Sequence, residues 1–165
     1  IKALESLGIR VHIDWTNSTP GFKFNEWEMK GVPLRMEVGP RDIKNNQVVI
    51  ARRDLGGKMF LPKKDILSEV PKLLSIIQNS LFSQAKKFRD DNTFSVSSYQ
   101  EFCSIIETGG FVRCGWNGSS KTELKIKEDT KATIRCIPFN ENPKGRYCIL
   151  SGEPAKHEVI FAKAY

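Results

Sequence analysis

Residues 24–58, FNEWEMKGVPLRMEVGPRDIKNNQVVIARRDLGGK, alternate acidic, basic and aromatic residues beside short apolar runs. Residues 22–30 favour a short helix that a glycine can end. Residues 32–38 alternate apolar and charged side chains, as a half-buried strand does, and residues 47–53 indicate a second strand. A glycine turn leads into a third strand at 58–62. This stretch therefore predicts a helix and three strands, which we place in one sheet with covering helices.

Apolar spacing extends this pattern in both directions along the chain. Residues 1–7 start within a helix, and residues 9–14 alternate as a further half-buried strand. A long helix covers residues 70–88, where apolar side chains recur at helical spacing, and Pro71 suits its first turn. The polar stretch 89–98 follows and is the best candidate for a domain boundary.

Beyond that boundary the pattern changes to shorter helices and strands. Helices are expected at 98–108 and 119–130. Strands are expected at 111–116, 131–139, 146–150 and 157–165. The sequence thus predicts an α/β domain with a mixed sheet at residues 1–92, followed by a small α+β domain at residues 93–165.

Composition narrows the class of partner. The 165 residues carry a formal net charge of +7, which favours an anionic partner such as nucleic acid. A basic surface that serves solubility alone is the plain alternative. No apolar run reaches the roughly 18 residues that a membrane span needs, so we expect no membrane partner. The four cysteines form no dense framework, which points to a reducing compartment and a cytoplasmic location.

The charged groups of residues 24–58 suit the chemistry of guanine. If the strands pair, four side chains converge at one edge of the sheet: Glu28, Arg35, Asp42 and Lys58. A carboxylate accepts from N1–H and N2–H of guanine, while O6 and N7 accept from Arg or Lys. Phe24 or Trp27 could supply a ring for an unstacked base of single-stranded RNA. The alternative is a solvated face with weak ion pairs, in which Trp27 belongs to the core.

These residues resemble a known family. GFKFNEWEMKGVPLRMEVGPRD with QVVIARRDLGGK is similar to the anticodon-binding domain of class II prolyl-tRNA synthetases. The tail, with RCIPF, G-x-P-A and VIFAKAY, resembles the extra C-terminal domain of the prolyl enzymes of archaeal and eukaryotic type, which some bacteria share. Threonyl, histidyl and glycyl enzymes carry domains related to the first motif, so the tail makes the assignment specific.

The resemblance implies a task for the segment, namely reading the two guanines that end proline anticodons. Phe24 would stack on a base, Lys58 would contact a base or the backbone, and Arg41 is a weaker candidate for a phosphate. Base edges would be contacted by Glu28, Arg35 and Asp42. It also implies that a strand and most of a helix precede Ile1, and that a catalytic domain outside this sequence binds ATP with magnesium, joins proline to tRNA(Pro) and forms a homodimer.

Many members of the family hold zinc in the last domain through four cysteines. The corresponding positions here are Cys114, Ser119, Cys148 and Ser151. Neutral serine is a poor zinc ligand, so we expect no bound zinc and a domain that relies on its apolar core. We expect that core to contain Phe111, Val112, Ile134, Ile137, Phe139, Ile149, Val159, Ile160 and Phe161, with Cys136 in a strand core and Cys103 as a buried thiol. The family also suggests that Tyr165 helps to order the active site.

Two other functions remain open at the level of sequence. The chain could be a free-standing RNA-binding module derived from a synthetase, in which case no catalytic domain would accompany it. It could also be a protein-interaction module that keeps the fold and has lost RNA binding.

Overall fold

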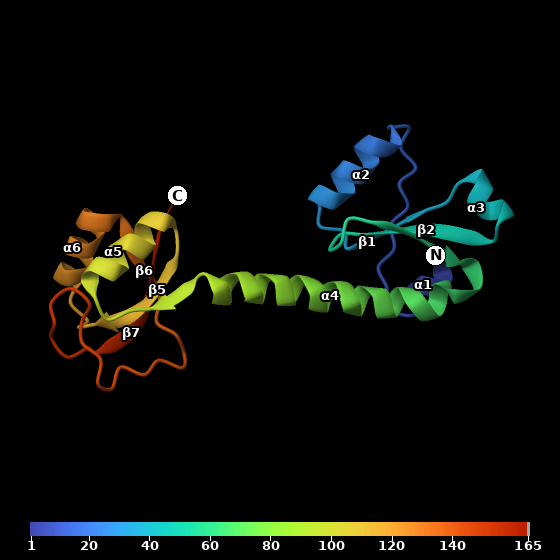
Figure 1. Cartoon of the computed structure of the whole chain (residues 1–165). Helices are drawn as coiled ribbons and strands as arrows, with labels where there is room; N and C mark the ends of the chain where they lie inside the picture. The colour runs from blue at the N-terminus through green and yellow to red at the C-terminus, as the bar shows by residue number, and fades with distance from the viewer. Residues whose placement is uncertain (165) are drawn as a thin grey trace. The chain divides into compact units, whose positions relative to one another are not determined.

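The computed structural model describes residues 1–164, and its contacts divide the chain into two compact units, Ile1–Ala85 and Lys86–Tyr165. The long helix α4 (Ile66–Asp91) passes from the first unit into the second (Figure 1). The expected fold class is confirmed, since each unit combines helices with a β-sheet, although the sheet of the first unit is antiparallel and not mixed as expected. The boundary expected at 92/93 stays a prediction. Among residues 1–164, no helix is both long and apolar enough to cross a membrane.

The first unit is built on an antiparallel sheet in the order β1-β2-β3. Its strands are β1 (Leu34–Glu37), β2 (Gln47–Arg52) and β3 (Lys58–Pro62). The helices that precede and interrupt the strands are α1 (Lys2–Glu5), α2 (Pro20–Met29) and α3 (Pro40–Lys44), and the short 3-10 turn η1 (Lys63–Asp65) leads into α4. Figure 1 shows α2 and α4 on opposite sides of this sheet.

The two faces of this sheet differ because side chains alternate along each strand. One face is apolar, and its buried Val48, Ile50 and Leu61 pack against Val70 and Leu73 of α4. The other face carries charged and aromatic side chains, as described in the next section. The alternation seen in the sequence therefore sets which face is free to meet a ligand.

The strand expected at residues 9–14 is not formed. The segment has no sheet partner among residues 1–164 and runs as an extended chain beside α2. Side chains hold it there: Trp27 Nε1 donates to Asp14 Oδ2 at 2.8 Å, and the His12 and Trp27 rings lie 4.4 Å apart. Alternation alone was misleading because a strand also needs a neighbour with free backbone groups.

Pro71 does not lie in the first turn of its helix. Helix α4 begins at Ile66, directly after η1, so Pro71 falls inside it. Ile66 and Val70 both pack on the first core, which accounts for the extra helical turn before the proline. Burial of apolar surface has outweighed the local preference of proline.

The second unit contains a four-stranded mixed sheet in the order β4-β5-β7-β6. Its strands are β4 (Thr93–Ser95), β5 (Phe111–Trp116), β6 (Ala132–Cys136) and β7 (His157–Lys163), with helices α5 (Tyr99–Thr108) and α6 (Ser120–Thr130). Strand β4 pairs with β5 in parallel, and the other pairs are antiparallel. The sequence did not predict β4, which forms within the polar stretch expected to mark the boundary.

The core of the second unit contains only part of the expected set. Val112, Ile149, Val159 and Phe161 are buried, whereas Phe111, Ile134 and Ile160 are half-buried. Ile137, Phe139 and Cys136 are exposed, because β6 bulges at its end and stops at Cys136. The strand expected at 146–150 is reduced to isolated bridges at Tyr147 and Cys148. Cys103 is half-buried against the core.

A buried carboxylate holds the irregular segment between β6 and β7. Glu158 is only 1% exposed, accepts a hydrogen bond from Arg113 Nη2 at 2.6 Å and forms an ion pair with Arg146 Nη2 at 2.7 Å. The main-chain N–H of Asn142 also donates to this carboxylate, at 3.2 Å. The segment is thus held by this buried charge together with its isolated backbone bridges.

Candidate nucleic-acid interface

The open face of the first sheet, which we call the ligand face, consists of three rungs of side chains. The strand register places Arg35, Ala51 and Lys58 on the first rung. The second rung contains Glu37, Val49 and Phe60, and the third contains Gln47 and Pro62. These residues share a face because they are separated by two positions along each strand.

Helix α2 brings two further side chains, Phe24 and Glu28, to the first rung. Thr19 caps its N-terminus by accepting from Phe22 N–H, and Pro20 occupies the first position, where no hydrogen bond is lost. Asp14 fixes the helix from the side through Trp27, as described above, and through an ion pair with Lys23 at 3.4 Å. Hydrogen bonds from Thr16 and then Trp27 hold the pKa of Asp14 well below its usual range. The carboxylate therefore stays charged and keeps α2 in place.

A compact cluster of cations and an aromatic ring results. The Arg35 guanidinium lies 3.9 Å from the centroid of the Phe24 ring, and Lys58 Nζ lies 5.1 Å from it. Glu37 binds both cations, with Arg35 Nε at 3.1 Å and Lys58 Nζ at 2.7 Å. The face therefore presents two positioned cations beside one ring.

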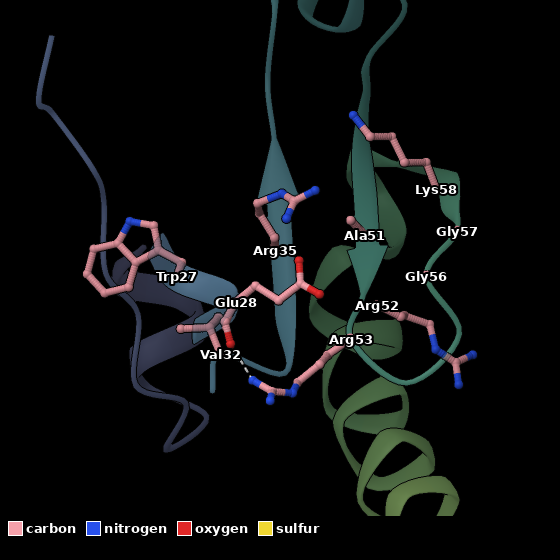
Figure 2. A pocket seen from close by; sticks show the side chains of 10 residues that line it. All are labelled: Trp27, Glu28, Val32, Arg35, Ala51, Arg52, Arg53, Gly56, Gly57 and Lys58. Atoms are coloured by element: carbon pink, nitrogen blue, oxygen red, sulfur yellow. Dashed lines mark hydrogen bonds between the residues drawn. The ribbon is translucent and has the colours of Figure 1, made fainter. Parts of the chain in front are cut away.

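A pocket of about 130 Å³ opens beside this cluster. It is lined by Trp27, Glu28, Val32, Arg35, Ala51, Arg52, Arg53, Gly56, Gly57 and Lys58. Figure 2 shows the Glu28 side chain reaching from the end of α2 across this pocket, while Arg53 donates to the Glu28 main-chain carbonyl. Among residues 1–164, the Glu28 carboxylate makes no hydrogen bond or ion pair, so its oxygens are free to accept.

The structure therefore brings four of the six sequence-predicted residues together and leaves two apart. Glu28, Arg35 and Lys58 line one pocket, and Phe24 touches both cations. Asp42 and Arg41 lie on α3, outside the residues that line the pocket.

Asp42 already has a local role at the other end of the ligand face. Its Oδ2 accepts from Gly39 N–H at 2.9 Å and caps α3, and its Oδ1 accepts from Gln47 Nε2 at 3.3 Å. The contact with Gln47 places Asp42 beside the third rung. Arg41 is exposed on the same helix.

Sequence reasoning missed two members of the site. Glu37 follows Arg35 by two residues on a strand, a spacing that places both on one face, and it joins the two cations. Arg53 binds the end of α2 although it lies 25 residues further along the chain, so only the fold could reveal it.

Two of the four positions that correspond to the family's zinc ligands carry a hydroxyl in place of a thiol. Burial raises the pKa of Cys114 to about 12 in the metal-free protein. Ser151 Oγ donates to Glu153 Oε2 at 3.1 Å, and Asn117 Nδ2 donates to the same carboxylate at 2.6 Å. No group of three or more His, Cys, Asp or Glu side chains with metal-ligand geometry occurs within residues 1–164. The residues present do not fit zinc.

Burial also raises the pKa of the Cys148 thiol, but hydrogen bonds involving Ser151 and the nearby main chain outweigh that effect. The net pKa of Cys148 is therefore below its ordinary value. Ser119 is tied to the same loop, because its main-chain N–H donates to Asn117 Oδ1 at 3.1 Å. The role suggested for Tyr165 falls outside the described residues.

Comparison with known proteins finds matches in both units. A family model described as an anticodon binding domain matches residues 1–73, and one described as the C-terminal domain of prolyl-tRNA synthetase matches residues 99–165. The ligand face and its pocket fall within the first match. The second match covers most of the second unit, from α5 onward.

Curated relatives match across both units. The chain is 49% identical to a proline–tRNA ligase of Acetoanaerobium sticklandii over 99% of this chain and 34% of the relative. It is 46% identical to proline–tRNA ligase 2 of Bacillus thuringiensis over 94% of this chain and 33% of the relative. It is 43% identical to the chloroplastic/mitochondrial proline–tRNA ligase of Arabidopsis thaliana over 99% of this chain and 32% of the relative.

The chain spans about a third of the length of these relatives. The second family model and the relatives name the same group of proteins, and the first family model describes a domain that this group contains. The chain belongs to the prolyl-tRNA synthetase family and corresponds to its anticodon-binding and C-terminal domains.

Proposed function

We propose that the ligand face binds the anticodon loop of a proline tRNA and reads its guanines, as part of an enzyme that joins proline to that tRNA. The observation that carries this proposal is the free Glu28 carboxylate, which shares one pocket with Arg35 and Lys58. Guanine is complementary to this set, because it offers two donors to a carboxylate and two acceptors to cations. Phe24, next to both cations, supplies the ring.

Replacing Glu28 by Gln tests the guanine contact directly. The amide presents one acceptor and one donor to the two donors of guanine, so binding of an anticodon stem-loop RNA should weaken by about 1–3 kcal/mol. Titrations at one fixed salt concentration measure the loss, since salt alone changes such affinities. Glu26→Gln is the matched control, because Glu26 lies on the same helix and pairs with Lys30 at 2.7 Å.

Inosine makes this test specific for the base, because it lacks the N2 amino group of guanine. Wild-type protein should lose affinity when inosine replaces the guanine read by Glu28, and the Glu28→Gln protein should lose much less. If Glu28→Gln and Glu26→Gln bind all RNAs as wild type does, the face is not a guanine reader. A protein-interaction module would then be the better account.

The remainder of the enzyme belongs to the same proposal. In the whole protein, a catalytic domain would bind ATP and magnesium and form the homodimer, and the present chain would select the tRNA. The length of the relatives, about three times that of this chain, supports such a domain. A reading frame without one would favour a free-standing RNA-binding module.

We also propose that the second unit folds without zinc and that the protein acts in the cytoplasm. Serines at two of the four ligand positions support the first point. The four cysteines are all free thiols, which supports a reducing compartment. Metal analysis of protein purified without chelator tests zinc binding, and cell fractionation tests the location.

A further inference from the structure

A second aromatic ring lies on the ligand face and has no part in the cluster described above. Phe60 of β3 is 66% exposed, and the register pairs it with Val49 on the second rung, with Glu37 on the other side of Val49. Among residues 1–164, no other ring and no cation lies over it, in contrast to Phe24. Leaving a phenyl ring in water forgoes the stabilisation that burial would give.

Phe60 lies between the two parts of the predicted site that the structure separates, namely the pocket and Asp42. Lys58, two residues before it, borders the guanine pocket. Pro62, two residues after it, pairs with Gln47, which donates to Asp42. Two strand residues span about 6.6–6.8 Å, so Phe60 occupies the interval between the pocket and Asp42.

The surroundings of this ring suit an anionic chain better than an apolar protein surface. Lys58 precedes it on the same strand, and Lys63 and Lys64 follow in η1. Of these, Lys58 is held by Glu37, while Lys63 and Lys64 are exposed. Single-stranded nucleic acids are bound by this combination of an aromatic platform and flanking cations.

We propose that Phe60 is a second stacking platform, which holds an unpaired base of the same RNA between the guanine pocket and Asp42. This inference rests on the proposed function, because it extends the same interface. Stacking on a phenyl ring tolerates any base, so Phe60 contributes affinity without sequence preference. Guanine selection stays with Glu28 and the two cations of the first rung.

Phe60→Leu tests the platform, since leucine keeps the apolar character and removes the ring. Binding of the anticodon stem-loop should weaken roughly 5- to 150-fold, the range for loss of one base–aromatic stack. The ratio of affinities for guanine and inosine RNA should not change. Phe82→Leu is the control, because Phe82 of α4 is 64% exposed and lies outside the ligand face.

Phe60→Trp provides a direct readout, because an indole ring should keep affinity and its fluorescence should respond when a base stacks on it. Removing single bases along the loop locates the partner: one abasic position should abolish this response. The same position should weaken wild-type binding but not weaken Phe60→Leu any further.

The outcomes separate the inference from the function on which it rests. If Glu28→Gln weakens binding while Phe60→Leu binds as Phe82→Leu does, Phe60 is no platform and the guanine pocket stands. If neither Glu28→Gln nor Phe60→Leu changes RNA binding, the ligand face itself is rejected as an RNA interface. If Phe60→Leu alters the guanine-to-inosine ratio, the division of roles proposed here is overturned.

Discussion

At the scale of single residues, Arg35 combines the functions that the ligand face needs. Its guanidinium lies over the Phe24 ring, pairs with Glu37 and borders the pocket. A planar cation can stack flat on a ring, and it can also donate two parallel hydrogen bonds along its edge, whereas an ammonium group can do neither. Charge alone therefore does not explain this position.

Arg35→Lys separates the shape of this cation from its charge. Because the charge remains, the salt dependence of RNA binding should change little, while affinity for guanine-containing loops should fall by about 1–3 kcal/mol. Titrations at several salt concentrations measure both quantities. Arg41→Lys, at an exposed position on α3, should leave guanine affinity unchanged. Equal effects of the two substitutions would contradict a shape-specific role for Arg35.

Strand alternation made some side-chain contacts of the ligand face predictable from the sequence. Contacts that depend on turns and helix ends were not predictable. Arg35 and Lys58 share a rung because β1, β2 and β3 pair in the expected order. Asp42 was placed with them by its position in the turn, but its carboxylate caps α3 and binds Gln47. Local backbone N–H groups compete for such carboxylates, and no sequence pattern shows which partner wins.

At the scale of elements, the longer strands and helices were predictable and the irregular segments were not. Strong periodicity located α4, α5 and α6 because packing follows it. Residues 9–14 alternate too, yet their side chains bind α2 instead of a strand. Phe139 was expected in the core, but the chain turns away after β6. Tertiary partners decide such segments, and they are not visible in local sequence.

The segment between β6 and β7 depends on the charge of Glu158. Burial raises the pKa of this carboxyl, but bonds from Arg113 and Asn142 and the charge of Arg146 outweigh it, so the pKa lies below 4.5. A carboxylate with a lowered folded-state pKa stabilises above its unfolded-state pKa, and that contribution disappears as pH falls through the folded-state value. The second unit should therefore lose stability in acid below pH 4.5.

Glu158→Gln tests this account. At neutral pH the second unit should lose about 1–3 kcal/mol of stability, because two arginines that are 30% and 36% exposed lose their charged partner. Its stability should then depend less on pH in the acidic range than that of wild type. Denaturant unfolding at several pH values measures both effects. Glu107→Gln, at an exposed site on α5, is the control, and identical acid profiles for wild type and Glu158→Gln would refute the account.

At the scale of the whole molecule, the chain has two separate hydrophobic cores. One contains buried residues from Val48 to Leu73, and the other contains buried residues from Val96 to Phe161. The buried residues of one core do not recur in the other. Each unit is therefore stabilised by its own core. We expect a core substitution in one unit to lower the stability of that unit and not of the other.

One substitution in each core tests this independence. Ile50, fully buried in the first core, can be shortened to Val at a cost of about 0.5–1.5 kcal/mol. Gly115→Ala perturbs the second core, because the added methyl would collide with the Tyr147 carbonyl and lie 2.9 Å from Ala155 Cβ. Hydrogen exchange followed by segment should show faster exchange only in the unit that carries the change. Acceleration of both units by either substitution would indicate one cooperative core.

Because Arg35 stacks on Phe24, a base can stack on that side of the ring only by replacing the guanidinium. A base that enters over this face must first evict the cation, whose attraction to the ring amounts to about 0.5–1 kcal/mol at an exposed site. Guanine gives the displaced guanidinium new acceptors in its O6 and N7, whereas adenine has an amino donor at the position of O6. Bases other than guanine are thus disfavoured while they enter the site. Discrimination should therefore appear in the association rate of the loop as well as in its dissociation rate.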